Sequence, residues 1–373
     1  MKMEPSVILL IDELGPGGAE RQICMLALEL ARKGYPVQIV CYYPNTWYQK
    51  YLLGDSVPVR LISWRNKIEK IWKVYRFLRK QKDNIVISFL EGANMLNILS
   101  RFPFKSKLSK IVISERFTYS YPFPLIRKIY LFFYKLADAI VVNSYSELKS
   151  LTEHAAFLSD KIRLIPNCVD LKKFRPATQE GIQKRGRLVF GVFASYSERK
   201  RPLDLIIAVE KIVEKIGKNT PYFVWYGENK DVVSGKIYKE FERATRMISE
   251  RGLGDFFDLR GPTPTPEEAL RTLDCVCLTS EKEGLPNSIC EAFASGKPVV
   301  ATRVGDVPYL VTEEKNGFLA EPRSPDSLAS ALMKMILLDE QKRIEMGRVA
   351  RLYAEQNFSI ERFSNQYLDI INK

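Results

Sequence analysis

The most informative stretch of the chain reads EGLPNSICEAFASGKPVV over residues 283–300, with Glu283 and Glu291 separated by seven residues. Gly284 and Pro286 interrupt regular structure, so Glu283 is predicted to lie on a loop. The apolar spacing then becomes helical and ends at a glycine, which is typical of the position just after a helix C-terminus. An apolar run follows, so the stretch predicts a loop, a short helix and a buried strand in succession.

The start of this predicted helix suits a bound anion. The first N–H groups of a helix point outward, and its dipole favours a negative group such as a phosphate there. Glu283 lies before the helix and Glu291 in its first turn or so, and each carboxylate can accept hydrogen bonds from sugar hydroxyls. The residues themselves therefore point to a nucleotide-sugar, with the diphosphate on the amides and the two sugars on the glutamates.

The same segment resembles the signature of the family 4 glycosyltransferases, which are retaining enzymes of the GT-B fold. The resemblance implies that Glu283 contacts the donor sugar as a catalytic residue and that Glu291 holds the ribose. It also places the intervening residues against the donor, and these are Gly284, Leu285, Pro286, Asn287 and Ser288. A loop–helix junction with two solvated acids is the plain alternative. The matches at Ala292, Gly296 and 298–300 argue against it.

A second match lies in the loop SYSERKRP at residues 195–202. The family usually presents an arginine and, five residues later, a lysine, both on the diphosphate. Lys200 matches the lysine and is assigned a catalytic role, whereas the arginine position falls on Ser195, which carries no charge. One cation of the phosphate clamp is therefore missing or is supplied by Arg199 or Arg201. We place Ser195 and Arg201 among the donor-binding residues.

The Gly-rich turn at residues 15–18 follows the first expected strand. The dinucleotide-binding fingerprint needs a third glycine, and Glu20 stands in its place, which argues against a dehydrogenase. The segment 17–21 instead resembles the family's first loop, where the backbone approaches the donor phosphates and the acceptor. We therefore count Gly17 and Gly18 as donor-binding, with an ordinary tight turn as the alternative.

Two further segments, 87–94 and 113–116, resemble cleft-facing strand ends of polysaccharide-building members. They supply the acceptor-side candidates Glu91, Asn94, Glu115 and Arg116. Many relatives carry a histidine near the first segment, but the single histidine of this chain, His154, lies in a polar stretch and is expected at the surface. Triads that need a histidine base are therefore disfavoured.

The chain has no Asp-x-Asp pair, the usual carboxylate device for a metal-bound nucleotide-sugar. We therefore expect no metal and no cofactor, with amides and cations meeting the charge of the leaving group.

Apolar runs alternate with helical patterns along the whole chain, which implies parallel sheets. We expect an α/β fold of the GT-B type, in which two Rossmann-like domains face a central cleft. The expected parts are an N-terminal acceptor-binding domain at 1–176, a linker at 177–187, a C-terminal nucleotide-sugar-binding domain at 188–357, and a helix at 358–373 that returns to the first domain.

The composition is that of a globular protein, with 46% hydrophobic residues over 373 positions, enough for two domains with their own cores. No apolar run approaches the roughly 18 residues that span a bilayer, and the first one is too short for a signal peptide. The six cysteines lie scattered in apolar contexts, so we expect reduced thiols and a cytosolic location.

Lysine and arginine outnumber aspartate and glutamate by 57 to 44, and the net charge of +13 favours anionic partners. Basic and aromatic residues gather at 65–80, 101–110 and 119–135. This pattern favours a protein peripheral on the inner face of the cytoplasmic membrane, with a helix at 67–80 that inserts side chains such as Trp72 into anionic lipid. Core-packed helices with a solvated basic back are the alternative.

The resemblance thus implies a retaining glycosyltransferase of cell-surface polysaccharide or glycoconjugate assembly. It would move a hexose or N-acetylhexosamine from a UDP-linked donor to a hydroxyl of a lipid-linked glycan. We expect a monomer or weak oligomer and no nucleic-acid partner. One alternative is a nucleotide-sugar epimerase on the same fold, and another is a non-enzymatic basic protein that binds membrane or nucleic acid. Thermal stabilisation by UDP separates the last from an enzyme.

Overall fold

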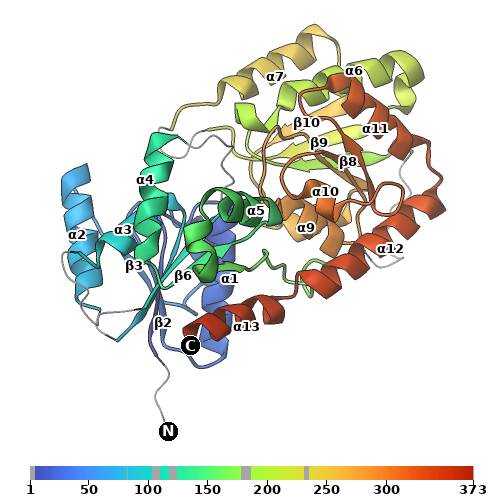
Figure 1. Ribbon diagram of the computed structural model, residues 1–373. Coiled ribbons are helices and arrows are strands. Elements are labelled where there is room, and N and C mark those ends of the chain that lie inside the picture. Colours follow the sequence, from blue (N-terminus) through green and yellow to red (C-terminus); the bar gives the residue numbers. More distant parts are fainter. Residues whose placement is uncertain are drawn as a thin grey trace. The chain divides into compact units, whose positions relative to one another are not determined.

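The computed structural model divides the chain into two compact units, each a parallel β-sheet flanked by helices (Figure 1). The first unit comprises Met1–Cys168 and Ile360–Lys373, and the second comprises Val169–Ser359. The residues described are 5–81, 83–102, 110–116, 124–177, 186–230 and 235–372. Two Rossmann-like domains were predicted from the alternation of strands and helices, and the structure confirms this class of fold.

The first unit is built on a seven-stranded sheet with the order β3-β2-β1-β4-β5-β6-β7. Its strands are β1 (Val7–Leu10), β2 (Val37–Cys41), β3 (Val59–Leu61), β4 (Ile85–Phe89), β5 (Lys110–Glu115), β6 (Ala139–Val142) and β7 (Ile162–Leu164). Every pairing is parallel, and Leu9 of β1 lies between Ile39 of β2 and Ile87 of β4. Helices cover both faces of such a sheet, which is why β1 is apolar at every position.

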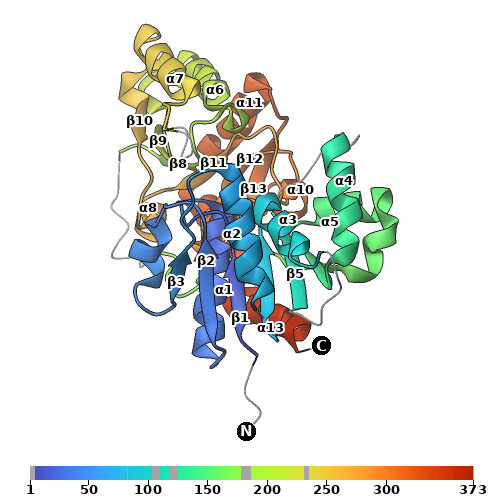
Figure 2. The ribbon, with the colours of Figure 1, turned by 90° about the vertical axis from the view of Figure 1, so that its left-hand side faces the viewer.

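Alternate residues of β1 face two different cores. Leu9 packs with α1 and α13, whereas Ile8 packs with α2 and α3 on the opposite face. The helices of this unit are α1 (Gly18–Arg32), α2 (Lys67–Arg79), α3 (Glu91–Leu99), α4 (Leu125–Phe133), α5 (Tyr145–His154) and α13 (Ile360–Ile371), with short turns at Gln49–Leu53, Tyr134–Leu136 and Ala156–Lys161. Figure 2 shows α2 and α3 side by side on the face turned to the viewer.

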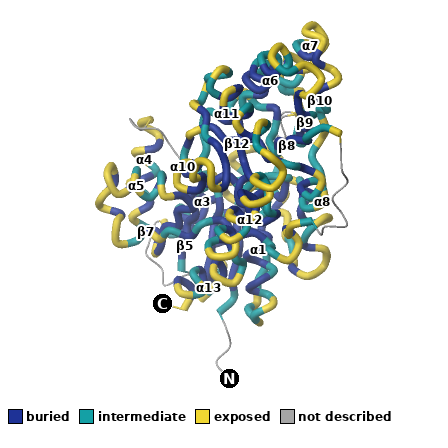
Figure 3. The backbone as a smooth tube through the Cα atoms, turned by 90° about the vertical axis from the view of Figure 1, so that its right-hand side faces the viewer, coloured by how far each residue is buried: buried dark blue, intermediate teal, exposed yellow. Residues whose placement is uncertain are grey.

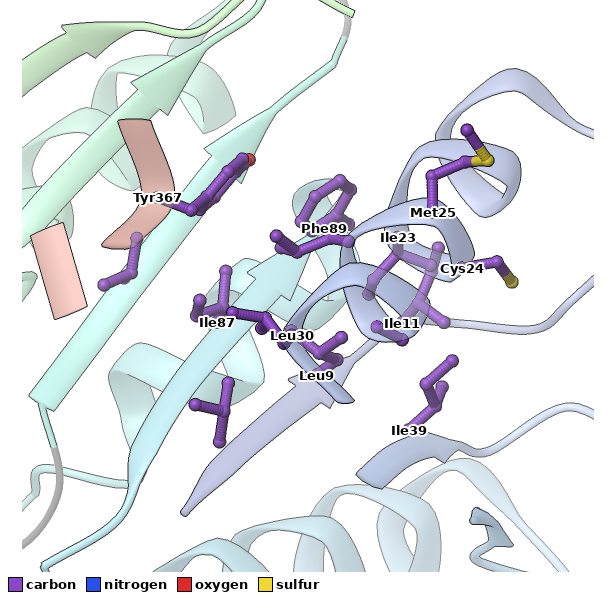
Figure 4. Packing of buried hydrophobic residues seen from close by; sticks show 14 of the residues in the cluster. Leu9, Ile11, Ile23, Cys24, Met25, Leu30, Ile39, Ile87, Phe89 and Tyr367 are labelled. Carbon is purple, nitrogen blue, oxygen red and sulfur yellow. The ribbon is translucent and has the colours of Figure 1, made fainter. Parts of the chain in front are cut away.

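The last helix, α13, is part of the first unit although the second unit precedes it in the sequence. Tyr367 is buried in the core formed by α1 and the sheet, where its ring lies 6.3 Å from that of Phe89 (Figure 4). Its hydroxyl accepts a hydrogen bond of 2.7 Å from Arg116. Packing and this polar contact together hold the end of the chain against the first sheet.

The second unit contains a six-stranded parallel sheet with the order β10-β9-β8-β11-β12-β13. Its strands are β8 (Val189–Phe193), β9 (Tyr222–Tyr226), β10 (Phe257–Arg260), β11 (Cys275–Leu278), β12 (Val299–Thr302) and β13 (Gly317–Ala320). Its helices are α6 (Pro202–Ile216), α7 (Lys239–Glu250), α8 (Pro266–Arg271), α9 (Asn287–Ala294), α10 (Val307–Leu310), α11 (Pro325–Leu337) and α12 (Glu340–Asn357), with short turns at Glu198–Lys200, Gly217–Asn219 and Gly254–Phe256. Figure 3 shows the central strands as buried and the outer turns of α7 and α12 as exposed.

The boundary between the units falls earlier than the sequence suggested. Val169 pairs with Ser359 as an isolated parallel bridge, and its amide donates to the Phe358 carbonyl at 2.8 Å. Phe174 is buried in a core of the second unit. Residues 169–176, which we expected in the first domain, therefore pack with the second, and most of the expected linker at 177–187 lies outside the described residues.

All six cysteines are buried thiols. Within the described ranges, no helix combines the length and the apolar character needed to cross a bilayer.

Candidate active site

The segment 283–300 folds as its sequence predicted. Glu283 lies on the loop that follows β11, α9 begins at Asn287, and Gly296 stands just after the helix with a left-handed φ of 67°. Pro286 occupies the N-cap, where it has no side chain that can cap the first N–H groups. The site therefore offers a helix N-terminus between two glutamates, which suits a phosphate.

The residues of this segment divide between core and surface. Leu285 and Pro286 are buried, and Leu285 anchors the loop in an apolar core. Asn287 and Ser288 are partly exposed at the start of α9. Glu291 lies one turn further along and is only 6% exposed, so a ligand that reaches it must enter the site.

Glu283 is held by two cations from the loop before α6. Lys200 donates a short hydrogen bond to one of its carboxylate oxygens, and Arg199 lies 3.5 Å from the other. Burial acts to raise the pKa of Glu283, but the two cations outweigh it and hold that pKa below its ordinary value. The carboxylate is therefore ionised at neutral pH.

Backbone contacts fix these two loops together. Thr279 donates its hydroxyl to the Lys200 carbonyl at 2.7 Å, and the Glu281 amide donates to the Arg199 carbonyl at 3.0 Å. Ser195, at the start of the first loop, lies 3.1 Å from the hydroxyl of Ser197 and does not provide a charge. These two hydrogen bonds to main-chain carbonyls thus set the spacing between the cations and Glu283.

The two arginines left open by the sequence take different positions. Arg199 contacts Glu283, and it also donates to the Lys282 carbonyl at 2.9 Å. Arg201 has a left-handed φ of 53° and makes a two-pronged contact with Asp204, with both distances at 3.0 Å. The geometry therefore favours Arg199 as the second cation of the site, whereas Arg201 secures the start of α6.

Sequence reasoning missed Gly305, which follows β12. Gly305 has a φ of 49°, and a Cβ atom placed on it would lie 2.2 Å from the Glu283 carbonyl oxygen. Its neighbour Asp306 donates its amide to the Gly284 carbonyl at 3.0 Å. A glycine just past the carboxyl end of a parallel strand was the available signal, because ligands of such sheets bind at that edge.

In the first unit, Gly17 and Gly18 form the start of α1. Gly17 is the N-cap, and the carboxylate of Glu20 folds back over it, so that an added Cβ would lie 2.1 Å from a Glu20 oxygen. Burial, reinforced by Glu13 and Asp12, raises the pKa of Glu20 to about 7. Glu20, which stands in place of the third glycine of the dinucleotide-binding fingerprint, therefore occupies the space beside Gly17.

Two acceptor-side candidates lie in a buried polar network of the first unit. Asn94 donates to Glu115 at 3.0 Å, and Glu115 accepts from Arg127 at 3.0 Å and from Tyr134. Arg127 is fully buried and also contacts Glu147 at 3.1 Å. These contacts hold the end of β5 against α3, α4 and α5, and any contact of Asn94 or Glu115 with an acceptor stays a prediction.

The other two candidates lie nearer the surface. Glu91 begins α3, has 30% of its side chain exposed and lies 3.9 Å from Arg127. Its predecessor Leu90 has an unusual φ of 75° for a residue with a side chain, and such strain gathers at functional sites. Arg116 donates to Asn167 at 2.8 Å as well as to the hydroxyl from α13 described above.

Among the residues that the structure describes, no group of three or more His, Cys, Asp and Glu side chains is placed to hold a metal ion.

Family models match both units of the chain. The model described as Glycosyltransferase Family 4 matches residues 16–173, and the model described as Glycosyl transferases group 1 matches residues 187–337. Curated relatives include D-inositol 3-phosphate glycosyltransferase of Corynebacterium jeikeium, 30% identical over 229 residues, which cover 58% of this chain and 53% of that protein. The match thus spans about half the length of that relative. Glycosyltransferase MJ1059 of Methanocaldococcus jannaschii is 24% identical over 85% of this chain and 84% of its own.

Solved structures show the same fold. The Anabaena protein Alr3699/HepE, solved with UDP-glucose, has a TM-score of 0.84 at 20% identity and covers 98% of this chain and 99% of its own. Sucrose-phosphate synthase from Thermosynechococcus elongatus has a TM-score of 0.79 at 17% identity, with 98% of each chain covered. These likenesses confirm the predicted GT-B fold.

The close approach at Gly305 predicts an unusually costly substitution. Gly305→Ala should destabilise the second unit by more than the roughly 1–2 kcal/mol that a left-handed alanine costs, because its Cβ would also displace the Glu283 backbone. Gly252→Ala is a matched control, since Gly252 has a φ of 64° and no atom within 4 Å of an added Cβ. Denaturant unfolding measures the loss of stability in both variants. Equal losses would show that a Cβ atom at position 305 does not clash with the Glu283 backbone.

Proposed function

The chain belongs to the glycosyltransferases, with a family 4 domain followed by a group 1 domain, and we propose that it is a retaining enzyme that uses a UDP-sugar. The transferred group is a hexose or N-acetylhexosamine, and the acceptor is a hydroxyl of a lipid-linked glycan. Such a reaction serves the assembly of cell-surface polysaccharide or other glycoconjugates.

One arrangement carries this proposal: the ionised Glu283, flanked by Lys200 and Arg199, beside the N-terminus of α9. A nucleotide-sugar presents a diphosphate and a sugar at the same place. The two cations and the helix N-terminus suit the diphosphate, and the carboxylate suits the sugar hydroxyls. All of these groups belong to the second unit.

The choice of UDP is supported by the fold relatives. HepE has been solved with UDP, with UDP and glucose, and with UDP-glucose. Glu291 is the group we assign to the ribose hydroxyls, because it is nearly buried in α9 and close to the helix start.

The proposed reaction needs no base from the protein. The bond between the anomeric carbon and the phosphate oxygen breaks, the acceptor oxygen bonds to the same face of that carbon, and the acceptor proton passes to the departing phosphate. Lys200 and Arg199 stabilise the negative charge on the diphosphate as it develops. Glu283 stabilises the positive charge on the sugar, and its lowered pKa keeps it ionised for this role.

We propose that transfer is independent of metal ions. In ion-dependent enzymes a divalent cation neutralises the diphosphate. Lys200 and Arg199 can supply that charge, and hydrogen bonds to their main-chain carbonyls fix their spacing from Glu283.

We further propose that the enzyme works as a monomer or weak oligomer at the inner face of the cytoplasmic membrane. The support is the exposure of Ile71 and Trp72 on the basic helix α2, side chains that insertion into lipid requires to be outside the core. Of the other two basic patches, residues 103–109 and 119–123 lie outside the described part of the chain.

A screen of nucleotide-sugars tests the reaction. Mass spectrometry should detect hydrolysis or transfer with a UDP-sugar, and Lys200→Ala should lower kcat by roughly 100-fold or more while the protein stays folded, as removal of one preorganised charge does elsewhere. Arg303→Ala is the control, because Arg303 pairs with Glu321 at the surface. Turnover of the Lys200 variant within about threefold of wild type would place the phosphate clamp elsewhere.

The two glutamates should affect UDP binding in opposite directions. Glu283→Gln removes a negative charge that occupies Lys200 and Arg199, so UDP should bind more tightly, by about 1–3 kcal/mol at an effective dielectric constant near 20. Glu291→Ala removes the proposed ribose acceptor and should weaken binding by roughly 1–3 kcal/mol. Calorimetry distinguishes the two variants, and a loss of affinity in both would contradict the assigned competition at Glu283.

EDTA should leave transfer unchanged. Activity measured with and without the chelator checks this, since the two cations replace a metal in the proposed site. Loss of activity in EDTA that Mg²⁺ or Mn²⁺ restores would refute metal independence.

A further inference from the structure

Helix α2 turns apolar side chains both inward and outward. Val74 and Leu78 are buried against the sheet, whereas Ile68, Ile71 and Trp72 are 82%, 47% and 53% exposed. Residues 68, 71, 72, 75 and 78 have the spacing of a single apolar face of a helix. In the structure, only one edge of this face packs against the core. Ile68, Ile71 and Trp72 therefore face away from the core, whereas Phe77 packs partly against it.

These side chains line a groove of about 470 Å³ between α2 and the end of α3. The lining is apolar and aromatic, and consists of Ile68, Ile71, Trp72, Tyr75, Leu99 and Phe102. The hydroxyl of Tyr75 donates to the Phe102 carbonyl at 2.8 Å, which connects the two sides of the groove. Figure 2 shows α2 and α3 adjacent on the surface of the first unit.

Cations stand along one side of this groove. The Arg76 guanidinium lies 5.0 Å from the Trp72 ring, and that of Arg79 lies 5.9 Å from the Tyr75 ring. The helix carries five lysines and arginines against Glu69 as its one acid. An occupant must therefore combine an apolar body with a negative group.

The apolar surface continues beyond the groove to α4. The ring of Phe102 lies 6.0 Å from that of Phe133 at the end of α4. Four further large apolar residues of α4 are exposed, namely Leu125, Ile126, Ile129 and Phe132. This extent suits an extended lipid surface better than a small soluble ligand.

We propose that the groove between α2 and α3 holds one hydrocarbon chain of an anionic membrane lipid. The chain contacts Trp72 and Leu99, and the lipid's negative head group lies near Arg76 and Arg79. Charge favours this occupant over a second copy of the protein, because two α2 helices brought face to face would juxtapose their cations. The inference deepens the proposed membrane setting of the enzyme, and it needs no feature of the donor site.

Quenching by brominated lipid tests occupancy directly. Vesicles of phosphatidylcholine with phosphatidylglycerol, brominated in the acyl chains, should quench the fluorescence of Trp72, identified by difference from a Trp72→Phe variant. The quenching should be absent with vesicles of phosphatidylcholine alone, and it should weaken as the salt concentration rises. Absence of quenching at low salt with bound vesicles would overturn the proposal.

A groove-filling variant separates chain binding from simple adsorption. Leu99→Trp keeps the surface apolar but occupies the groove, and should weaken vesicle binding at least tenfold in co-sedimentation. Leu352→Trp is the control, because Leu352 is 56% exposed on α12 in the other unit and should bind vesicles like wild type. Unchanged vesicle binding by Leu99→Trp would show that no chain enters the groove.

Two measurements keep the outcomes distinct. UDP affinity by calorimetry should be unchanged in Leu99→Trp, so that loss of vesicle binding cannot be confused with failure of the donor site or of folding. Sedimentation of the wild type without lipid should show a monomer. A dimer that Ile68→Glu dissociates would assign the groove to a second copy and would overturn the proposal.

Discussion

The ion pairing of Glu283 with Lys200 and Arg199 is the interaction on which the candidate active site of the second unit depends. It brings together the loop after β11 and the loop before α6, and hydrogen bonds from the Thr279 hydroxyl and the Glu281 amide hold the two loops together. The lowered pKa of Glu283 is a consequence of these cations. Without a ligand the carboxylate and the cations satisfy one another, so a bound diphosphate would have to share or replace the carboxylate as their partner.

Parallel sheets explain why these groups meet. In each unit the strands end at one edge, and the loops that follow them converge there. In the second unit this edge collects the Glu283 loop, the start of α9 and the backbone at Gly305. In the first unit the corresponding edge is stabilised from within by Arg127, a buried cation between Glu115 and Glu147. The removal of one partner from such a group is costly, because it leaves a buried charge uncompensated.

The first unit has apolar side chains in two settings, in its cores and on its surface. Its sheet is covered on both faces, yet α2 and α4 retain large apolar side chains outside the core. Each is accompanied by lysine or arginine, which fits the excess of positive charge in the chain. A surface that is both apolar and cationic suits contact with an anionic bilayer, whereas a purely solvated face gains nothing from exposed aromatic rings.

The sequence by itself determined the alternation of strands and helices, the loop and helix at 283–300, and the stop at Gly296, because these signals come from residues near one another in the chain. Only the tertiary structure decided that Lys200 meets Glu283 across 83 positions and that Arg199 rather than Arg201 joins it. Strand order brings such residues together, and local spacing does not encode it. Likewise, the apolar spacing along α2 did not show which edge of its apolar face the sheet would cover. The crossover from β3 to β4 fixes how that helix lies on the sheet.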